Sequence, residues 1–202
     1  HLIGLTAKPP PALGAALDLR AELAGAAADR PATWRGRVYA ELGYTDLAGW
    51  RPWIDYPADV QSGQGAIRLW ATLDAGRFTQ GTADVALSSV SARLAPDLPP
   101  LELSTLSGRL QARQAGAGYE ISGRKLALAP VHGTELPPSD MRFEWQPAAQ
   151  APAQLPEHGS LSASVVELQP LAQVGAALPL PPEVRQLLAE LSPRGRLNDA
   201  RL

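Results

Sequence analysis

The chain has 202 residues, of which 45% are hydrophobic, so it is long enough to bury a core and is not an intrinsically disordered tail. Its formal net charge of −2 excludes a global field that would draw it to nucleic acid or to anionic lipid headgroups. It has no cysteine, which excludes disulfides, thiolate nucleophiles and cysteine-ligated zinc or iron–sulfur sites.

The first third of the chain alternates polar and apolar residues, as strands of a half-buried sheet do. Strands are predicted at residues 13–23 and 34–42, with a turn region rich in Gly, Ala, Asp and Pro between them. The first of these segments is rich in alanine and is also compatible with a helix. Asp46 can cap a short helix that extends to Trp53 and that Pro52 limits in length.

Hairpins are predicted along the middle of the chain. Residues 66–73 and 78–87 flank Asp74-Ala75-Gly76, which is a strong turn signal. A proline-rich break at residues 96–100 then interrupts the ladder, because proline has no N–H to donate. Further strands are predicted at residues 101–112, 119–129, 141–145 and 161–165.

The last part of the chain changes to helical spacing. Apolar residues recur every three or four positions over residues 166–178, which favours a helix. Pro181 and Pro182 precede Glu183, which favours a second helix from Glu183 to Leu191. The predicted fold class is therefore mainly β, a curved antiparallel sheet of hairpins with two or three short helices.

Residues suited to catalysis are few and scattered. The three histidines lie far apart, in termini or loops, and none has a partner at metal-ligand spacing. Gly63-Gln64-Gly65 lacks the spacing of a dinucleotide fingerprint and is interpreted as a turn. The carboxylates of Asp55 and Asp59 border a proline-containing loop and are expected to be solvated. The residues therefore predict a protein that is not an enzyme and that needs no cofactor or metal.

Aromatic residues crowd the first third of the chain beside several arginines. They could form a stacking platform for a carbohydrate or a single-stranded nucleic acid. The alternative is that they pack as core or as a lid, since Trp50 and Trp53 lie one turn apart on the predicted short helix. The residues concerned are Trp34, Tyr39, Tyr44, Trp50, Trp53 and Tyr56, with Arg35, Arg37 and Arg51.

The order of the segments resembles the AsmA-like superfamily of bacterial envelope proteins, and specifically its YhdP branch. The resemblance runs from about Trp34 to the end of the chain and rests on diffuse Gly, Leu and Trp patterns. The stretches that carry it are WRGRVYAELGYTDLAGWRPWID, GQGAIRLWATLDAGRFTQGTADVALSSVSARLAPDLPPLELSTLSGRLQAR, GYEISGRKLALAP and LPPEVRQLLAELSPRGRLNDARL.

The resemblance also implies how the chain is organised. Family members are long, repetitive periplasmic proteins tethered to the inner membrane of Gram-negative bacteria, and Met141 is the only methionine here. Residues 1–202 are therefore expected to be a single β-rich segment excised from such a protein, with the weakest pattern in 1–33 and helices in 166–191. Residues 192–202 match the P-x-G-x-L step that opens the next repeat, and this strand is predicted to have nothing to pair with.

The resemblance implies a long apolar β-groove that shields acyl chains while phospholipids move between the inner and outer membranes. The implied partners are phospholipid, other segments of the same chain and envelope proteins at either end, without nucleic acid. An alternating sheet suits this task, since each buried methylene contributes about 0.8 kcal/mol. The candidate groove residues are Leu69, Leu73, Val85, Leu87, Leu103, Leu110, Ile121, Leu128, Phe143 and Val165.

Three function classes stay open at this point. The first is a lipid-conducting segment, the second an envelope scaffold or protein-interaction module, and the third a carbohydrate or nucleic-acid binder. A continuous apolar face favours the first class and a closed core with a polar surface favours the second. An aromatic cleft bordered by arginines favours the third.

Overall fold

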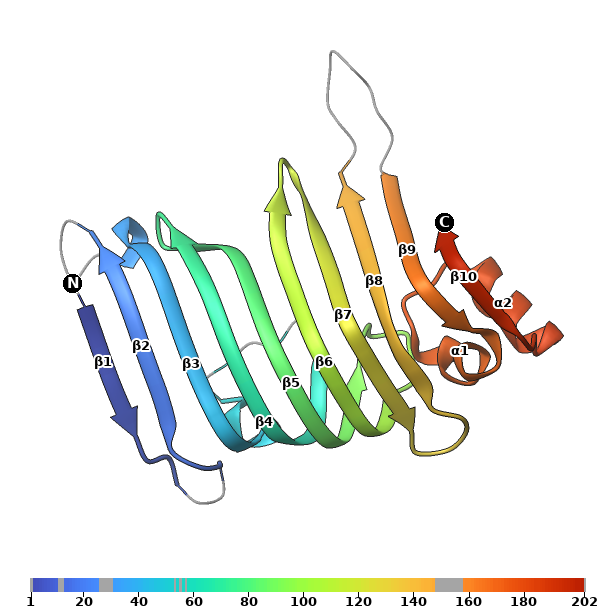
Figure 1. Ribbon diagram of the computed structural model, residues 1–202, viewed down its shortest axis with the longest axis horizontal. Helices are drawn as coiled ribbons and strands as arrows, with labels where there is room; N and C mark the ends of the chain where they lie inside the picture. Colours follow the sequence, from blue (N-terminus) through green and yellow to red (C-terminus); the bar gives the residue numbers. More distant parts are fainter. Residues whose placement is uncertain are drawn as a thin grey trace, which may run out of the picture.

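The computed structural model describes residues 2–10, 13–25, 31–52, 54, 56, 58–147 and 158–201. Ten strands form one antiparallel sheet, and each strand pairs with its neighbours in the chain, in the order β1 to β10 (Figure 1). The strands are β1 (Leu2–Ala7), β2 (Leu17–Ala24), β3 (Arg35–Asp46), β4 (Asp59–Asp74), β5 (Arg77–Arg93), β6 (Leu101–Ala115), β7 (Gly118–Pro130), β8 (Leu136–Gln146), β9 (His158–Glu167) and β10 (Arg196–Arg201).

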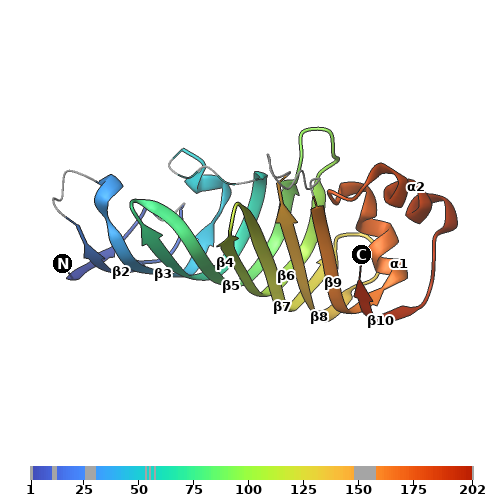
Figure 2. The same ribbon diagram turned by 90° about the horizontal axis from the view of Figure 1, so that it is seen from above.

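Two helices follow β9 in the chain, α1 (Leu168–Val174) and α2 (Pro182–Leu191). Pro182 occupies the first turn of α2 together with the acidic Glu183, and Ser192 ends the helix in the left-handed conformation. Figure 2 shows both helices on one side of the sheet, beside β8, β9 and β10. The predicted mainly β fold with short helices is therefore confirmed.

The register gives the sheet two chemically different faces. Residues directly opposite each other on paired strands point to the same side, and successive residues alternate. One face carries Leu69 of β4, which pairs with Ala83 of β5, and Ala83 in turn pairs with Leu110 of β6. We call this the inner apolar face, and the opposite one the outer polar face.

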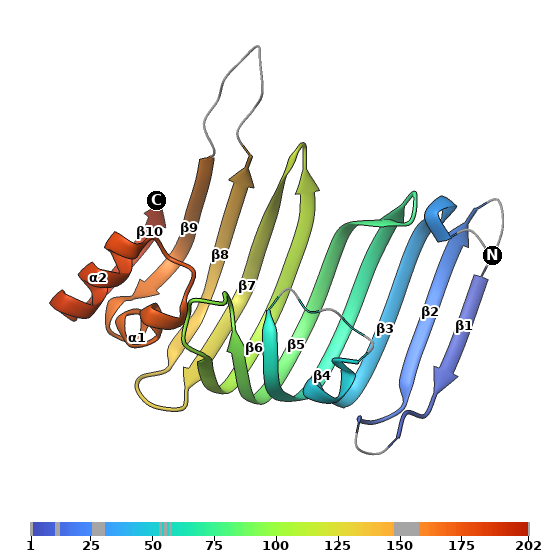
Figure 3. The same cartoon turned by 180° about the vertical axis from the view of Figure 1, so that it is seen from behind.

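A line of β-bulges folds the sheet. The register shifts between Ser62 and Gln64 in β4, between Ser107 and Arg109 in β6, and between Gly123 and Leu126 in β7. Bulges bend a strand and increase its twist. Figure 3 shows β4, β5 and β6 turning back on themselves near the bottom of the view, with the inner face enclosed by the bend. We call this line the crease.

The best-packed part of the molecule lies inside the crease. Leu87 and Val90 of β5 pack against Leu103 of β6, which is only 2% exposed. Leu47, from the segment that follows β3, packs on the same cluster. The core is therefore local to the bend and leaves much of the inner face outside it.

Glycine is required at one point of the crease. Gly65 has φ +147°, and a Cβ atom there would lie 2.1 Å from the carbonyl oxygen of Ala86 on β5. Gly65→Ala is therefore expected to lower the free energy of unfolding by about 2 kcal/mol or more, as measured by urea titration. Gly43→Ala in β3 is the matched control, because a Cβ atom at Gly43 meets nothing within 4 Å. Equal stability of the two variants would contradict this prediction.

The outer polar face is bound together by cross-strand ion pairs. Arg109 of β6 holds Asp84 of β5 in a bidentate pair, with Nε–Oδ1 at 2.5 Å and Nη2–Oδ2 at 2.8 Å. The hydrogen bonds from Arg109 lower the pKa of Asp84 below the usual carboxyl range, against a smaller opposing effect of burial.

This pKa shift makes part of the stability depend on pH. A carboxyl whose pKa is lowered by folding stabilises the protein above its unfolded pKa, and that contribution is lost as the pH falls toward the folded value. Asp84→Asn is therefore expected to reduce the loss of melting temperature between pH 7 and pH 3. Thermal melting of both proteins at the two pH values measures this. An identical loss in both proteins would show that the pair contributes nothing.

Four predictions about local structure are wrong. β3 continues to Asp46 and is followed by a single 3-10 turn, Ala48–Trp50, where a longer helix was predicted. Asp46 Oδ1 does accept the Ala48 N–H, at 3.1 Å, while Trp53 lies outside the described residues. Gly63–Gly65 lie within β4 at the crease and form no turn. His158 begins β9 and does not lie in a loop.

The fourth error concerns the end of the chain. β10 was predicted to have no pairing partner, but it pairs antiparallel with β9, with Leu197 opposite Val166 and Ala200 opposite Ala163. The segment that contains the two helices connects β9 to β10 and returns the chain to the side of β9. At the point of return the Leu168 N–H donates to the Gly195 carbonyl at 2.9 Å. β1, which pairs with β2, was not predicted either.

Candidate functional site

The ten candidate residues all lie on the inner apolar face. The register connects them through shared pairs, such as Leu110 with Gly123, Ile121 with Phe143, and Val85 with Ile67. The structure therefore brings together on one surface residues that are up to 96 positions apart in the chain, from Leu69 to Val165. Whether they contact lipid stays a prediction.

The candidates differ in how far they are covered. Leu87 and Leu103 are buried in the cluster at the crease and serve as core. Leu69 is 37% exposed and Ile121 is 42% exposed, although both lie in the middle of the sheet. The others, which are half-buried, are Leu73, Val85, Leu110, Leu128, Phe143 and Val165. The candidates away from the crease thus form an accessible apolar surface.

Sequence reasoning missed several residues that extend this surface. Tyr119 of β7 stacks on Trp145 of β8 with ring centroids 5.1 Å apart, and lies 6.2 Å from the ring of Phe143. Leu42 of β3 and Ile67 of β4 continue the surface toward β2. The signal was present, because all of these residues obey the same period of two as the candidates beside them.

The inner apolar face carries no charged residue on the described parts of β2 to β8 between the crease and the hairpin ends. In β2, for example, Leu17 and Leu19 lie on this face, whereas Asp18 and Arg20 lie on the other. If both faces of the sheet were in water, charged residues would be expected on both faces and not on one alone. The sheet therefore presents a broad uncharged surface to whatever lies inside the bend.

Three segments cover part of the inner side. Trp50 donates from Nε1 to Thr45 Oγ1 at 2.8 Å, which fixes the turn after β3 beside the crease. Leu98, in the proline-rich segment between β5 and β6, is 5% exposed. In α1, Gln173 Oε1 accepts the Thr134 N–H at 2.8 Å and so attaches the helix to the β7–β8 connection.

The described aromatic residues of the first third do not form one platform. Tyr39 lies on the outer polar face against Trp70, with ring centroids 5.5 Å apart, whereas Trp50 bonds to Thr45 near the crease. Tyr56 donates to the Leu47 carbonyl at 3.1 Å, which also places it away from Tyr39. The arginines beside them form ion pairs, namely Arg35 with Asp74, Arg37 with Glu22, and Arg51 with Asp59.

Several titratable groups on the outer face have structural partners. The Tyr39 hydroxyl donates to Glu41 at 2.5 Å, and this bond, followed by the bond from Arg68, lowers the pKa of Glu41. Within the described residues no group of three or more His, Asp or Glu side chains is arranged to hold a metal ion.

A comparison with protein-family models gives a match over residues 1–202 to the model described as YhdP protein. The chain belongs to the YhdP family. This confirms the resemblance that the segment order indicated. No curated protein and no solved structure matched the chain. The YhdP family is a lipid-transport family of the bacterial envelope. Among the described residues, no helix is long and apolar enough to span a bilayer.

Proposed function

We propose that this chain is a non-catalytic segment of a periplasmic bridge that carries phospholipids between the inner and outer membranes. Acyl chains lie along the inner apolar face, while headgroups stay in water at the open side of the bend. The full-length protein is anchored in the inner membrane, and neighbouring segments of the same chain continue the path. No reacting group is needed, since the lipid is moved and not changed.

The observation that carries this proposal is an uncharged apolar face with exposed residues in the middle of a sheet. A closed sandwich core would bury such residues, yet Leu69 and Ile121 remain 37% and 42% exposed. Exposed contiguous apolar surface in a folded protein generally marks a binding surface. Membership in a lipid-transport family makes an acyl chain the fitting occupant.

Contact with the inner apolar face offsets part of the free-energy cost of taking a lipid out of a bilayer. Shielding ten methylenes recovers roughly 8 kcal/mol at about 0.8 kcal/mol each, a useful part of the cost of leaving a bilayer. An apolar surface made of alternate residues on successive strands offers similar contacts at each step. Lipid would therefore slide along it without a deep energy minimum.

The proposal is tested on protein purified from bacterial cells. We expect lipid extraction and native mass spectrometry to find bound diacyl phospholipid. A photoreactive amino acid at Leu69 is expected to crosslink to that lipid. The same probe at Thr72, on the outer polar face of the same strand, is the matched control. Protein that is free of lipid and takes up no fluorescent phospholipid would instead favour a scaffold module.

A further inference from the structure

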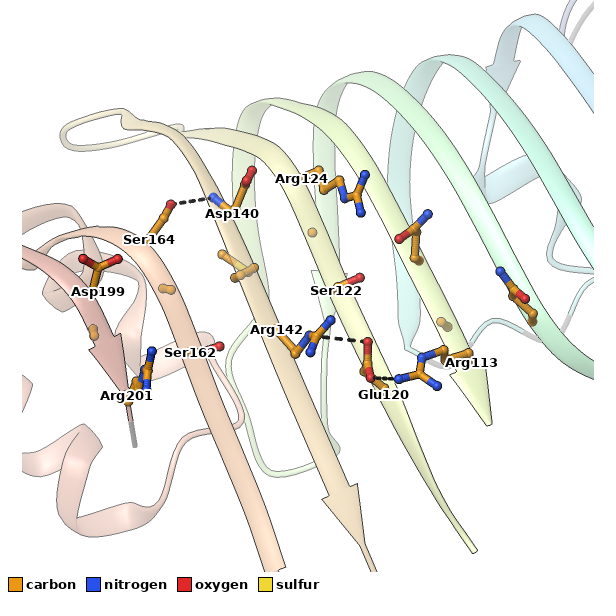
Figure 4. Close-up of a pocket in the computed structure, with 17 residues that line it drawn as sticks. Arg113, Glu120, Ser122, Arg124, Asp140, Arg142, Ser162, Ser164, Asp199 and Arg201 are labelled. Atoms are coloured by element: carbon orange, nitrogen blue, oxygen red, sulfur yellow. Dashed lines mark hydrogen bonds and ion pairs between the residues drawn. The ribbon is translucent and has the colours of Figure 1, made fainter. Parts of the chain in front are cut away.

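The outer polar face contains a cavity whose chemistry the lipid proposal does not use. It has a volume of about 490 Å³ and is lined by outward-facing side chains from β5 to β10 (Figure 4). Pockets that bind small molecules have volumes of about 300–1,000 Å³. Because it opens on the side opposite the inner apolar face, the cavity is separate from the proposed lipid path.

The cavity has a row of three aligned donors. The register places Arg142 of β8 opposite Ser162 of β9, and Ser162 opposite Arg201 of β10. Neighbouring strands lie about 4.8 Å apart, so the backbone positions of Arg142 and Arg201 flank Ser162 on either side, and two long arginine side chains could reach one ligand above the serine. Within the described residues, neither Ser162 Oγ nor the Arg201 side chain has a hydrogen-bond or ion-pair partner.

A buried carboxylate holds one end of this row. The Glu120 side chain is only 7% exposed, accepts a hydrogen bond from Arg113 on one side, and forms an ion pair with Arg142 Nε, at 3.4 Å, on the other. Figure 4 shows Glu120 between the two arginines. Two guanidinium groups thus share one buried negative charge. Arg142 also lies 3.6 Å from the exposed Glu144. A guanidinium has five N–H donors, so Arg142 keeps donors for a ligand.

The charge balance of the lining is positive. Four arginines, Arg113, Arg124, Arg142 and Arg201, face three carboxylates, Glu120, Asp140 and Asp199. Asp140 already accepts the Lys125 N–H at 2.8 Å through Oδ1. Within the described residues, neither the Arg124 nor the Arg201 side chain forms an ion pair, so both guanidinium groups are available to an anionic ligand.

We propose that this cavity binds a phosphorylated sugar, with the phosphate held between Arg142 and Arg201 above Ser162. A tetrahedral phosphate presents oxygens to donors on three sides, whereas a planar carboxylate has only two oxygens to share among them. Arginine binds phosphate through paired N–H donors, and charge-assisted bonds of this kind are the strong ones. The amide of Gln111 and the hydroxyl of Ser122, which line the same cavity, suit the hydroxyl groups of a sugar.

The phosphorylated sugar could be a soluble molecule or the headgroup of a phosphorylated glycolipid, and the same site would hold either. A titration followed by two-dimensional NMR separates these sources. The probes are glucose 1-phosphate, glucose, acetate, and vesicles of phosphatidylcholine with and without a phosphorylated glycolipid. Glucose 1-phosphate is expected to shift the amide signals of β8, β9 and β10, whereas glucose and acetate are not. Binding to the glycolipid vesicles alone would assign the headgroup as the source.

Variants test the assignment of residues. Arg201→Gln and Ser162→Ala are each expected to weaken the binding of glucose 1-phosphate about fivefold or more, with unchanged melting temperature. Arg196→Gln is the matched control, since it removes the same charge from β10 at an exposed residue that is paired with Glu167 outside the cavity. An equal loss in Arg196→Gln, equal binding of acetate, or no shift with any phosphorylated probe would overturn the proposal. Because none of these readouts involves the inner face, failure here leaves the lipid proposal intact.

Discussion

Leu103→Asp is expected to abolish folding of the sheet. Leu103 is 2% exposed and packs with Leu87 and Val90 inside the crease, where the structure offers no partner for a carboxylate among the residues described. Burying an unpaired charge costs several kcal/mol, which is comparable to the 5–15 kcal/mol that stabilises a whole domain. The milder Leu103→Ala is expected to cost about 2–5 kcal/mol through the lost contacts and the cavity left behind.

Circular dichroism and amide NMR measure this effect. Ser107→Asp is the matched control, because Ser107 lies in the same strand but is exposed on the outer polar face. We expect the control to melt cooperatively within a few degrees of the unsubstituted protein. A cooperative transition in Leu103→Asp would mean that the crease is not the folding core.

Ile121→Asp is expected to have the opposite profile, with the fold kept and lipid binding lost. Ile121 is 42% exposed between Ala112 and Phe143 on the inner apolar face, so a carboxylate there stays in contact with water. An acyl chain that passed this point would have to desolvate the charge. Lipid crosslinking from a probe at Leu110 is therefore expected to fall at least tenfold.

The residue next in the chain provides the control. Ser122 points to the opposite face of the same strand, so Ser122→Asp introduces the same charge without entering the proposed path. Undiminished crosslinking in Ile121→Asp would exclude lipid contact at this position. If Ile121→Asp unfolded instead, Ile121 would belong to the core, which its exposure argues against.

The alternation of residues predicted most of the sheet, because period two follows directly from strand geometry. The segment around Met141, Phe143 and Trp145 is an example, although its strand, predicted over residues 141–145, begins five residues earlier, at Leu136, and ends at Gln146. The same period placed all ten candidate groove residues on one face. Alternation could not show how deeply each side chain is buried. Leu103 and Ile121 obey the same pattern, but Leu103 lies inside the crease and Ile121 lies outside it.

The crease accounts for two of the four errors. A bulge adds a residue to one strand of a pair, which interrupts the alternation of polar and apolar residues along that strand. The sequence of a single bent strand can then be mistaken for two strands or for a turn. This happened at Gly63–Gly65, where β4 continues through the bend. The capping preference of Asp46 was recognised correctly, but pairing with Gln64 extended β3 through that residue. Cross-strand partners such as Arg142, Ser162 and Arg201 depend on register, which local patterns do not reveal.

The order of the strands in the sheet has a consequence for how this protein assembles. Since every strand pairs with strands adjacent in the chain, no contact between sheet elements has to wait for a distant segment to be synthesised. Folding can begin at any hairpin and extend strand by strand, as in repeat proteins with nearest-neighbour cooperativity. Hydrogen exchange is then expected to be slowest for β4, β5 and β6, which share the crease, and to become progressively faster toward β1 and β10.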